Sequence, residues 1–598
     1  MAAYRAPVSD MRFVINELAG FESVRALMDD ADLTGDLVDA ILEEADKFAS
    51  GVLAPLNVVG DREGCVLENG VVRTPTGFRE AYAQFTEGGW NGIHFAREHG
   101  GQGLPRLVST AVSEMWTGAN MAFGLCPMLT QAAADALARH GSDDLKQAYL
   151  PKLVSGQWAG TMNLTEPQAG SDLARVRTRA VPDSDGAYRI SGQKIFITFG
   201  DHDLSENVIH MVLARLPDAP DGVHGLSLFL IPKFLVREDG SLGQRNDLRV
   251  VSLEHKLGIN GSPTAVMAYG DNEGALGFLV GEENRGLELM FTMMNTARLA
   301  VGLEGIGIAE RAYQDARAYA LERVQGRAIG NDDPSPVPIA HHPDVQRMLM
   351  SMKSQTEAGR ALAYAAAADT DIAERHPDPE VRRRHQRMVD LLTPVVKAWS
   401  TDVGIEVAST AIQVYGGMGY IEESGVAQHL RDARIAAIYE GTNGIQAADL
   451  AGRKVARDGG AAAAALIAEL RAVEAELAAA GERLAPIRRW LGIGLDDLAA
   501  ATGWLVETFP EHPRRVAAVA AHYLRLMGIV AGGGLMAKAA LKAAGHLDAG
   551  EGDPGFWQAK LVSARFFAEV FVSRSGALRL LVTDGWGALE EFDPDRDL

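Results

Sequence analysis

The sequence has few cysteines and few basic residues for its length. Cys65 and Cys126 are its only cysteines, and neither stands in a CxxC motif or beside a Cys/His cluster. We therefore expect no disulfide framework and no metal site, and the pattern favours a reducing compartment. Lysine and arginine number 57 against 79 aspartates and glutamates, which gives a net charge of −22. Such a charge repels phosphate backbones, so we expect no general nucleic-acid binding, although one anionic metabolite is compatible with it.

Long apolar runs are also scarce. The segment from Met1 to Pro7 has no apolar stretch of signal-peptide length, so we expect no export. The most conspicuous uncharged run, Leu526 to Ala537, is bounded by Arg525 and Lys538 and is shorter than the ~20 residues that cross a bilayer. We therefore expect a soluble, cytoplasmic protein without a transmembrane segment.

The chain is too long for a single hydrophobic core. Domains usually hold about 100–200 residues, so 598 residues predict three or four packed units. Helical spacing of apolar residues dominates residues 11–160, β-branched and aromatic residues dominate the next segment, and helical spacing returns at Gly286. We therefore expect a mainly helical α+β protein with units at residues 1–160, 161–280, 281–455 and 461–598.

The second of these units has the pattern of an antiparallel meander or a small barrel. Its β-branched and aromatic runs are short, and turn residues such as Pro220 to Gly222 separate them. The runs that we expect to be strands are Lys194–Thr198, Val208–Ala214, Gly225–Ile231 and Thr264–Ala268.

The last unit is rich in alanine, which indicates packed helices. Glycine and proline disfavour helix interiors, so we expect breaks at Gly492, Pro513, Gly532–Gly534 and Pro554. The tract Ala461–Ala480 keeps no strict heptad, which favours a bundle helix over a coiled coil.

The segment Met162–Asp172 has two interpretations. An extended edge at this point offers backbone N–H and C=O groups to a flat heteroaromatic ring, and Gly170 with Ser171 allows close approach to a phosphate. The same residue types are common in turns, so a plain turn is the alternative.

The segment Phe196–Thr198, taken alone, is interpreted as a strand in the hydrophobic core.

Arg298 and Arg323 stand in a helical segment that is otherwise rich in Ala, Leu and Gly. Arginine is rarely buried without an anion, and its planar fork of donors suits a phosphate or pyrophosphate. A surface salt bridge explains either arginine equally well when each is taken singly.

A glycine run and a glutamate follow later in the chain. The glycines of Gln413–Tyr420 permit close backbone approach to a ligand. Glu440 follows the apolar stretch Ala436–Tyr439, where a carboxylate is costly to ionise, so we expect its pKa to be raised toward the range of a general base. A glutamate that caps a helix is the alternative interpretation.

Several segments stand in the order found in one flavoenzyme family: Thr165–Asp172, Gly192–Thr198, Glu254–Ser262, Gly281–Gly286, Tyr319–Arg323, Gln413–Gly419 and Tyr439–Thr442. Residues 1–450 as a whole resemble the acyl-CoA dehydrogenases. The resemblance implies a helical domain, a middle β-barrel-like domain and a helical bundle domain, with FAD as cofactor. Residues 461–598 resemble the extra C-terminal helical domain of the longer bacterial members, including those that act on 3-(methylthio)propanoyl-CoA.

The resemblance also implies roles for single residues. Those expected to line the flavin ring are Met162, Leu164, Thr165, Phe196, Ile197 and Thr198. Those expected to bind the rest of FAD are Ser171, Arg323, Gln325, Gln413, Gly416, Gly417, Thr442 and Gln446, with Gln413 and the two glycines contributed across a subunit interface. Those expected to contact the substrate are Ser171, Asn295, Arg298 and Gly441.

Glu440 matches the catalytic base of the family. Some relatives carry this carboxylate instead just before the arginine that corresponds to Arg298, but Ala297 stands there and cannot accept a proton. The chain also departs from the family, because Arg323–Arg327 lacks the usual aromatic residue. We expect longer loops than the compact members have around Asn331–Pro338 and Asp371–Arg384.

The resemblance implies α,β-dehydrogenation of a saturated acyl-CoA to the trans-2-enoyl-CoA. The expected substrate is 3-(methylthio)propanoyl-CoA or a short- or medium-chain fatty acyl-CoA, and the expected electron acceptor is electron-transfer flavoprotein. An acyl-CoA oxidase that uses oxygen and a catalytically silent scaffold of the same fold are the alternatives. We expect a homodimer.

Overall fold

The computed structural model describes residues 3–28, 30, 32–330 and 333–598. Its chain contacts divide it into two compact units. The helical unit consists of Met1–Ala45, Pro105–Gly118 and Val301–Leu598, and the β-containing unit consists of Asp46–Leu104 and Ala119–Ala300. Each unit is described separately below.

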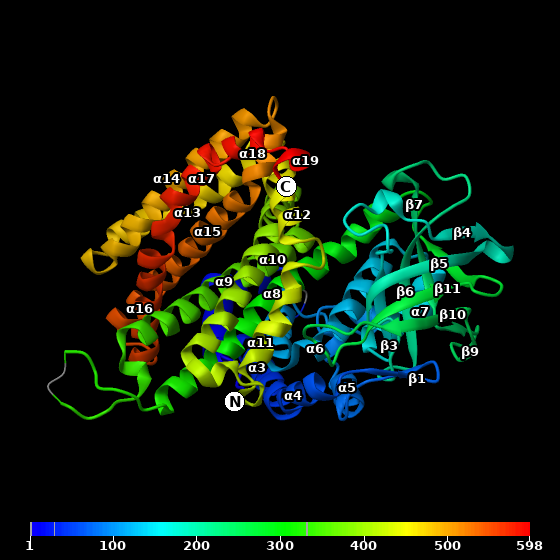
Figure 1. Cartoon of the computed structure of the whole chain (residues 1–598), viewed down its shortest axis with the longest axis horizontal. Coiled ribbons are helices and arrows are strands. Elements are labelled where there is room, and N and C mark those ends of the chain that lie inside the picture. Colours follow the sequence, from blue (N-terminus) through cyan, green and yellow to red (C-terminus); the bar gives the residue numbers. More distant parts are fainter. Residues whose placement is uncertain (1–2, 29, 31, 331–332) are drawn as a thin grey trace. The chain divides into compact units, whose positions relative to one another are not determined.

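The β-containing unit is built around one large sheet (Figure 1). Within the described residues this sheet has eight strands: seven pair in the order β10-β11-β5-β12-β7-β6-β3, and the eighth, β4, pairs with both β5 and β6. The pairings β5-β12-β7-β6-β4-β5 form a closed circuit, which is a small barrel and not a meander. The strands are β3 (Trp158–Asn163), β4 (Arg179–Pro182), β5 (Ala187–Thr198), β6 (Asn207–Arg215), β7 (Leu226–Pro232), β10 (Leu248–Leu253), β11 (Thr264–Tyr269) and β12 (Ala275–Val280).

The central strand β6 is buried on both faces. Its residues alternate between two hydrophobic clusters: Met211 and Leu213 belong to one, and Val212 and Ala214 belong to the other. The first cluster also contains residues of α6 (Arg106–His140) and α7 (Asp143–Ser155). This two-sided burial explains why the sequence of β6 is an almost continuous apolar run.

A short hairpin in this unit was not predicted. Strands β1 (Val66–Glu68) and β2 (Val71–Arg73) pair between α4 (Ala54–Glu63) and α5 (Phe78–Glu87), in a region for which we expected only helices. The turn residues Asn69 and Gly70 both have positive φ, 51° and 76°. Asn-Gly between apolar residues is a strong hairpin signal, so the sequence did contain the information.

The helical unit contains long helices packed side by side (Figure 1). Residues 1–450, which we call the family segment, contribute these long and short helices to the unit: α8 (Gly286–Glu322, from Val301 onward), α9 (Pro343–Arg375), α10 (Pro379–Tyr415), α11 (Val426–Ala433) and α12 (Asn443–Ala448). The C-terminal segment contributes α13 (Ala461–Ala479), α14 (Ala485–Thr508), α15 (Pro513–Ala549), α16 (Pro554–Val570) and α17 (Ser575–Asp584). The expected breaks at Pro513 and Pro554 are confirmed, because the preceding helix ends before each proline and a new helix begins at it.

Two other expected breaks in the C-terminal segment are wrong. Helix α14 continues through Gly492, and α15 continues through Gly532–Gly534. A Cβ at Gly534 would lie 2.4 Å from Cδ2 of Leu470, and one at Gly533 would lie 2.6 Å from Cγ2 of Val572. These glycines therefore allow close helix packing and do not interrupt the helix.

The expected long loop at Asp371–Arg384 is also wrong. Asp371 belongs to α9 and Arg384 to α10, so a short connection joins the two helices. Asp378 caps α10 by accepting a 2.8 Å hydrogen bond from the Glu380 N–H. In the other expected loop, Asn331 and Asp332 lie outside the described residues.

A buried ionic cluster joins distant parts of the helical unit. Arg360 on α9 is 1% exposed and binds Glu114 on α6 (Nη2 to Oε1, 2.6 Å) and Asp10 on α1 (Val8–Phe13). Lys560 on α16 binds Asp10 and lies 3.0 Å from Glu357 on α9. Although burial acts to raise it, the charges of Lys560 and Arg360 hold the pKa of Asp10 well below its usual range. The C-terminal helices are thus tied to the family segment by charge pairs as well as by apolar packing.

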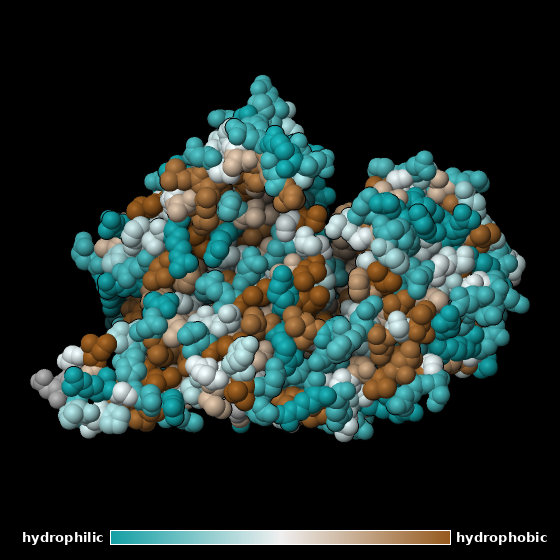
Figure 2. Space-filling view, in the orientation of Figure 1, coloured by the Kyte–Doolittle hydropathy of each residue, from teal (hydrophilic) through white to brown (hydrophobic). Residues whose placement is uncertain are grey.

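Two helices in the described part of the chain, α6 and α15, are long and apolar enough to cross a membrane by length and composition alone. In the structure, 78% and 72% of their most apolar windows are buried. Such burial is typical of core helices. In the view of Figure 2, hydrophilic residues cover most of the visible face, and apolar residues form scattered patches between them.

Candidate active site

A buried ion pair fixes the strand edge predicted to face the flavin ring. Lys194 Nζ on β5 lies 2.8 Å from Glu166 Oε1 and donates a 2.9 Å hydrogen bond to the Leu164 carbonyl. The Ile195 N–H donates to the Thr165 carbonyl at 2.9 Å. Burial lowers the pKa of Lys194 to about 8, an effect that the neighbouring carboxylate of Glu166 opposes. The half-buried side chains of Met162, Leu164 and Thr165 are thereby held beside the end of β5.

The end of β5 contains a strained β-bulge. The register with β11 shifts between Ala265, which faces Ile197, and Met267, which faces Lys194. Within the bulge, Phe196 has φ 59° and leaves 59% of its surface exposed, whereas Ile197 is buried and Thr198 is half-buried. A bulky residue in the left-handed region costs on the order of 1–3 kcal/mol and is typical of functional sites. Phe196 is therefore not the core residue that its sequence context alone suggested.

A buried polar network lies behind this edge, and sequence reasoning missed it. Asn163 Nδ2 donates to Tyr269 Oη at 2.5 Å and lies 3.1 Å from His210 Nδ1. The Thr161 hydroxyl donates to Asn163 Oδ1 at 2.7 Å. Burial lowers the pKa of His210 to about 3, so its ring is neutral at physiological pH. The only signal in the sequence was the presence of polar residues in strands that are otherwise apolar.

Two predicted substrate residues lie together on α8, in the β-containing unit. Arg298 is 6% exposed, its Nη1 donates a 3.4 Å hydrogen bond to Asn295 Oδ1, and its guanidinium lies 5.7 Å from the Phe291 ring centroid. This burial rules out the surface salt bridge as the explanation for Arg298. Asn295 is exposed, and Ala297 is buried between the two. Ser171, the remaining predicted contact in this unit, is exposed in the loop after β3.

The predicted base, Glu440, occupies a strained turn in the helical unit. Its φ is 56°, and that of Gly441 is 79°. Gln446 Nε2 donates to the Glu440 carbonyl at 3.2 Å, and Lys397 Nζ donates to the Gly441 carbonyl at 2.8 Å. Thr442 is the N-cap of α12, because its Oγ1 accepts from the Ile445 N–H at 3.2 Å, so Glu440 is not the capping residue. The Glu440 side chain is half-exposed.

The remaining predicted cofactor residues lie at the C-terminal ends of α8 and α10. Tyr319 stacks on Tyr415 with ring centroids 4.1 Å apart, which joins the two helix ends. The predicted cofactor residues at these two helix ends are exposed, and they are Arg323, Gln325, Gln413, Gly416 and Gly417. Gly416 has φ 59°, and a Cβ at Gly416 or Gly417 would meet no atom within 4 Å, so the backbone there is open to a ligand.

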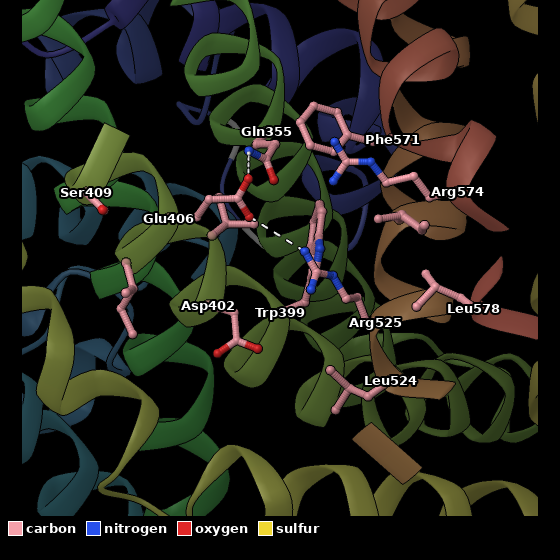
Figure 3. Close-up of a pocket in the computed structure, with 13 residues that line it drawn as sticks. Gln355, Trp399, Asp402, Glu406, Ser409, Leu524, Arg525, Phe571, Arg574 and Leu578 are labelled. Carbon is pink, nitrogen blue, oxygen red and sulfur yellow. Dashed lines mark hydrogen bonds and ion pairs between the residues drawn. The ribbon is translucent and has the colours of Figure 1, made fainter. Parts of the chain in front are cut away.

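One further pocket, of about 400 Å³, lies between α9, α10 and the C-terminal helices (Figure 3). Glu406 lies 3.7 Å from Arg525 in an ion pair and accepts a 3.4 Å hydrogen bond from Gln355 Nε2. Trp399 and Phe571 contribute its apolar walls. None of the predicted catalytic, cofactor or substrate residues lines this pocket.

Four domain families match the chain in sequence. They are the acyl-CoA dehydrogenase N-terminal domain over residues 38–157, the middle domain over 161–271, the C-terminal domain over 284–455, and an acetyl-CoA dehydrogenase C-terminal-like domain over 466–593.

The chain is also similar to whole proteins. It is 50% identical to 3-methylmercaptopropionyl-CoA dehydrogenase of Ruegeria pomeroyi, over 97% of this chain and 98% of that protein. It is 35% identical to the broad-specificity linear acyl-CoA dehydrogenase FadE5 of Mycobacterium tuberculosis, over 100% and 98%. Among solved structures, ACDH-11 of Caenorhabditis elegans in complex with C11-CoA superposes with a TM-score of 0.78 at 21% identity, over 98% and 96%, which shows the shared fold.

The helical and β-barrel architecture, the strained turns and these matches define an acyl-CoA-oxidising flavoenzyme. The chain belongs to the acyl-CoA dehydrogenase family and carries the extra C-terminal domain. It is an oxidoreductase that acts on an acyl-CoA with FAD as cofactor, so the predicted family, fold class, reaction and cofactor are confirmed.

The residues present suit FAD. Phe196 offers an exposed aromatic ring, and Arg323 offers an exposed guanidinium for a diphosphate. Gly416 and Gly417 leave the backbone accessible. The buried Oε1 of Gln446 has no hydrogen-bond partner among the described residues, which is the state expected of a group that meets a ligand.

Proposed function

We propose that Glu440 is the base that removes the α-proton of a saturated acyl-CoA. The observation that carries the proposal is the left-handed turn at Glu440 and Gly441, whose two carbonyls are bound by Gln446 and Lys397. Strain of this kind persists only where surrounding contacts hold it, and it concentrates at active sites. No carboxylate is available at the other position that the family uses, because Ala297 stands there.

In the proposed mechanism, the backbone N–H of Glu440 donates to the thioester carbonyl and stabilises enolate character as the α-proton is lost. The Glu440 carboxylate takes up that proton. Bound FAD supplies the acceptor for the hydride that leaves the β-carbon. Asn295, Arg298, Ser171 and Gly441 orient the substrate.

We propose the following cofactor contacts, which the bulge, the open glycines and the exposed helix ends support. Strands β3 and β5 and the loop after β3 contribute Met162, Leu164, Thr165, Ser171, Phe196, Ile197 and Thr198. The helical unit contributes Arg323, Gln325, Gln413, Gly416, Gly417, Thr442 and Gln446.

We propose 3-(methylthio)propanoyl-CoA as the substrate, with short- and medium-chain fatty acyl-CoA thioesters as weaker ones. The 50% identity to a 3-methylmercaptopropionyl-CoA dehydrogenase over nearly the whole chain supports the first. The 35% identity to a broad-specificity linear acyl-CoA dehydrogenase supports the second.

The test is anaerobic reduction of the bound flavin. The purified protein is mixed separately with butanoyl-, 3-(methylthio)propanoyl-, octanoyl- and palmitoyl-CoA, and the visible absorbance is followed. We expect the fastest bleaching with 3-(methylthio)propanoyl-CoA, and faster bleaching by another thioester would overturn the substrate assignment. Glu440→Gln is expected to bind flavin but to bleach at least ~10³-fold more slowly, in the range found when a catalytic group is removed. Wild-type bleaching by this variant would refute the assigned base.

Electron-transfer flavoprotein is the proposed electron acceptor, and oxygen is the alternative acceptor. Reduced protein that transfers electrons to electron-transfer flavoprotein and forms little peroxide in air supports a dehydrogenase. Stoichiometric peroxide during turnover would instead identify an oxidase.

We further propose a cytoplasmic homodimer with four domains at residues 1–160, 161–280, 281–455 and 461–598. The free cysteines Cys65 and Cys126 support a reducing compartment, and the domain matches support the division. The exposed glycines at 416 and 417 support a subunit interface at that end of the helical unit. Light scattering of the holoenzyme measures the oligomeric state directly.

A further inference from the structure

A second glutamate lies close to the proposed base. Glu304 on α8 is 2% exposed, and its Oε2 accepts a hydrogen bond from the hydroxyl of Tyr439. Its other oxygen, Oε1, is buried and has no hydrogen-bond partner among the described residues. An ionised carboxylate with one oxygen left unpaired in the interior is costly, so this environment suits a protonated carboxyl group.

The partner of Glu304 immediately precedes the strained turn. Tyr439 is the residue before Glu440, so the position of its side chain constrains the turn from the N-terminal side. Gln446 and Lys397 hold the carbonyls of Glu440 and Gly441 from the other side. The hydrogen bond to Glu304 is the one described for the Tyr439 side chain. If it is lost, this side chain no longer opposes relaxation of the left-handed conformation of Glu440.

The charged groups around Glu304 act in opposite directions. The pKa of Glu304 is raised to about 8; burial is the largest cause, and the carboxylate of Glu440 also raises it. The hydrogen bond from Tyr439 and the charge of Lys397 lower it only in part. Glu304 is therefore mostly protonated near neutral pH, and it can accept the Tyr439 hydrogen bond without placing a second negative charge beside the base.

We propose that Glu304 is a positioning residue for catalysis: its buried carboxyl group binds Tyr439 and so holds Glu440 in the left-handed turn from which it reaches the substrate. This inference rests on the proposed role of Glu440. It assigns a function to a residue on a different helix, 135 positions from its partner Tyr439.

Three variants test the proposal in the holoenzyme. Glu304→Ala removes the acceptor, Glu304→Gln retains an acceptor of the same shape as the protonated acid, and Tyr439→Phe removes the donor. Glu406→Gln is the matched control, because Glu406 also lies in the helical unit but pairs with Arg525 at the separate pocket. Flavin content and Tm are measured first, and rates are expressed per bound flavin.

The expected result is a split between kcat and KM in steady-state oxidation of 3-(methylthio)propanoyl-CoA with an excess of an artificial electron acceptor. We expect Glu304→Ala and Tyr439→Phe each to lower kcat at least tenfold with KM within about twofold of the wild type, which corresponds to about 1.4 kcal/mol or more in the barrier. The double variant should be no slower than either single one. Glu304→Gln should restore kcat to within about threefold. Wild-type kcat in Glu304→Ala, or equal loss in Glu304→Gln, would overturn the proposal.

A second measurement does not depend on turnover. Hydrogen exchange of the backbone amides in residues 439–442 should become at least tenfold faster in Glu304→Ala than in the wild type, Glu304→Gln or Glu406→Gln. Unchanged exchange would show that Glu304 does not hold the turn. If Glu440→Gln proves fully active, the assignment of the base fails, and this exchange measurement alone still shows whether Glu304 organises the turn.

Discussion

Lys194 and Glu166 form an ion pair with side chains that are 0% and 3% exposed, and the pair joins β5 to the chain leaving β3. Both residues stand inside segments that resemble the family's flavin-contact motifs. The pair therefore fixes the spacing of two backbone edges that are predicted to face one ring, although neither side chain is predicted to touch it.

Removing one partner of this pair is expected to cost both stability and cofactor. Glu166→Gln leaves the Lys194 ammonium buried without a counter-charge, and breaking a buried pair in this way costs about 3–5 kcal/mol. We expect a lower Tm and less bound flavin in the purified protein. Glu288→Gln is the control, because the side chains of Glu288 and its partner Arg285 are 64% and 47% exposed, and solvent screens such a surface pair so that its loss changes stability little. Equal effects of the two substitutions would contradict the role given to Lys194.

Replacing Phe196 by glycine should stabilise the cofactor-free protein and weaken its binding of FAD. Phe196→Gly relieves the left-handed φ of 59° and is expected to stabilise the cofactor-free protein by about 1 kcal/mol. The same change removes the exposed ring and should weaken FAD binding, which titration of the cofactor-free protein measures. Asn69→Gly relieves a φ of 51° in the β1–β2 turn and should leave FAD affinity unchanged. A Phe196→Gly protein with wild-type FAD affinity would remove Phe196 from the site.

Alanine substitutions at two glycines of α15 should change the stability of the protein in opposite directions. At Gly534 a Cβ would lie 2.4 Å from Leu470, so Gly534→Ala is expected to destabilise the protein by about 1–3 kcal/mol. At Gly545 a Cβ meets nothing within 4 Å, and alanine there should add about 0.5–1 kcal/mol through helix propensity. Thermal or urea unfolding of the two variants checks the signs. A stabilising Gly534→Ala would show that α13 and α15 are not packed closely at this point.

Glu304 makes stability depend on pH in a defined direction. The pKa of this carboxyl is raised from an ordinary 4.5 to about 8 in the folded protein. Between these values the folded state keeps a proton that the unfolded state has lost, so this group's contribution to stability falls as pH rises. Glu304→Gln has no carboxyl group to ionise at this position. The Tm of this variant minus the Tm of the wild type should therefore increase by several degrees from pH 5 to pH 8. A constant difference in Tm across this range would mean that Glu304 is charged in the folded protein.

Much of the fold was accessible from the sequence because the deciding interactions are local, and the site residues were predicted from motifs that are local as well. Runs of β-branched residues predicted β6 and β7, and the segment around Glu440 resembled the family's base closely enough to single it out. The glycines at 532–534 were misread because only the distant side chains of Leu470 and Val572 determine that a missing Cβ serves packing there. Glu304 was missed for the same reason, since its partner Tyr439 is 135 positions away and no local pattern links the two.

The ionic cluster around Asp10 also bears on how the protein is made. Asp10 and Lys560, which bind each other in the core, are separated by 550 positions. At about 5–20 residues per second, a ribosome adds Lys560 roughly half a minute to two minutes after Asp10. Until then Arg360 pairs with Asp10 and Lys353 pairs with Glu357, but the Lys560 ammonium that binds both carboxylates is missing, so this charge cluster is complete only after the C-terminal helices emerge. Folding of the helical unit therefore finishes only after its last helices have been synthesised. A nascent chain stalled before α16 should remain a substrate for chaperones.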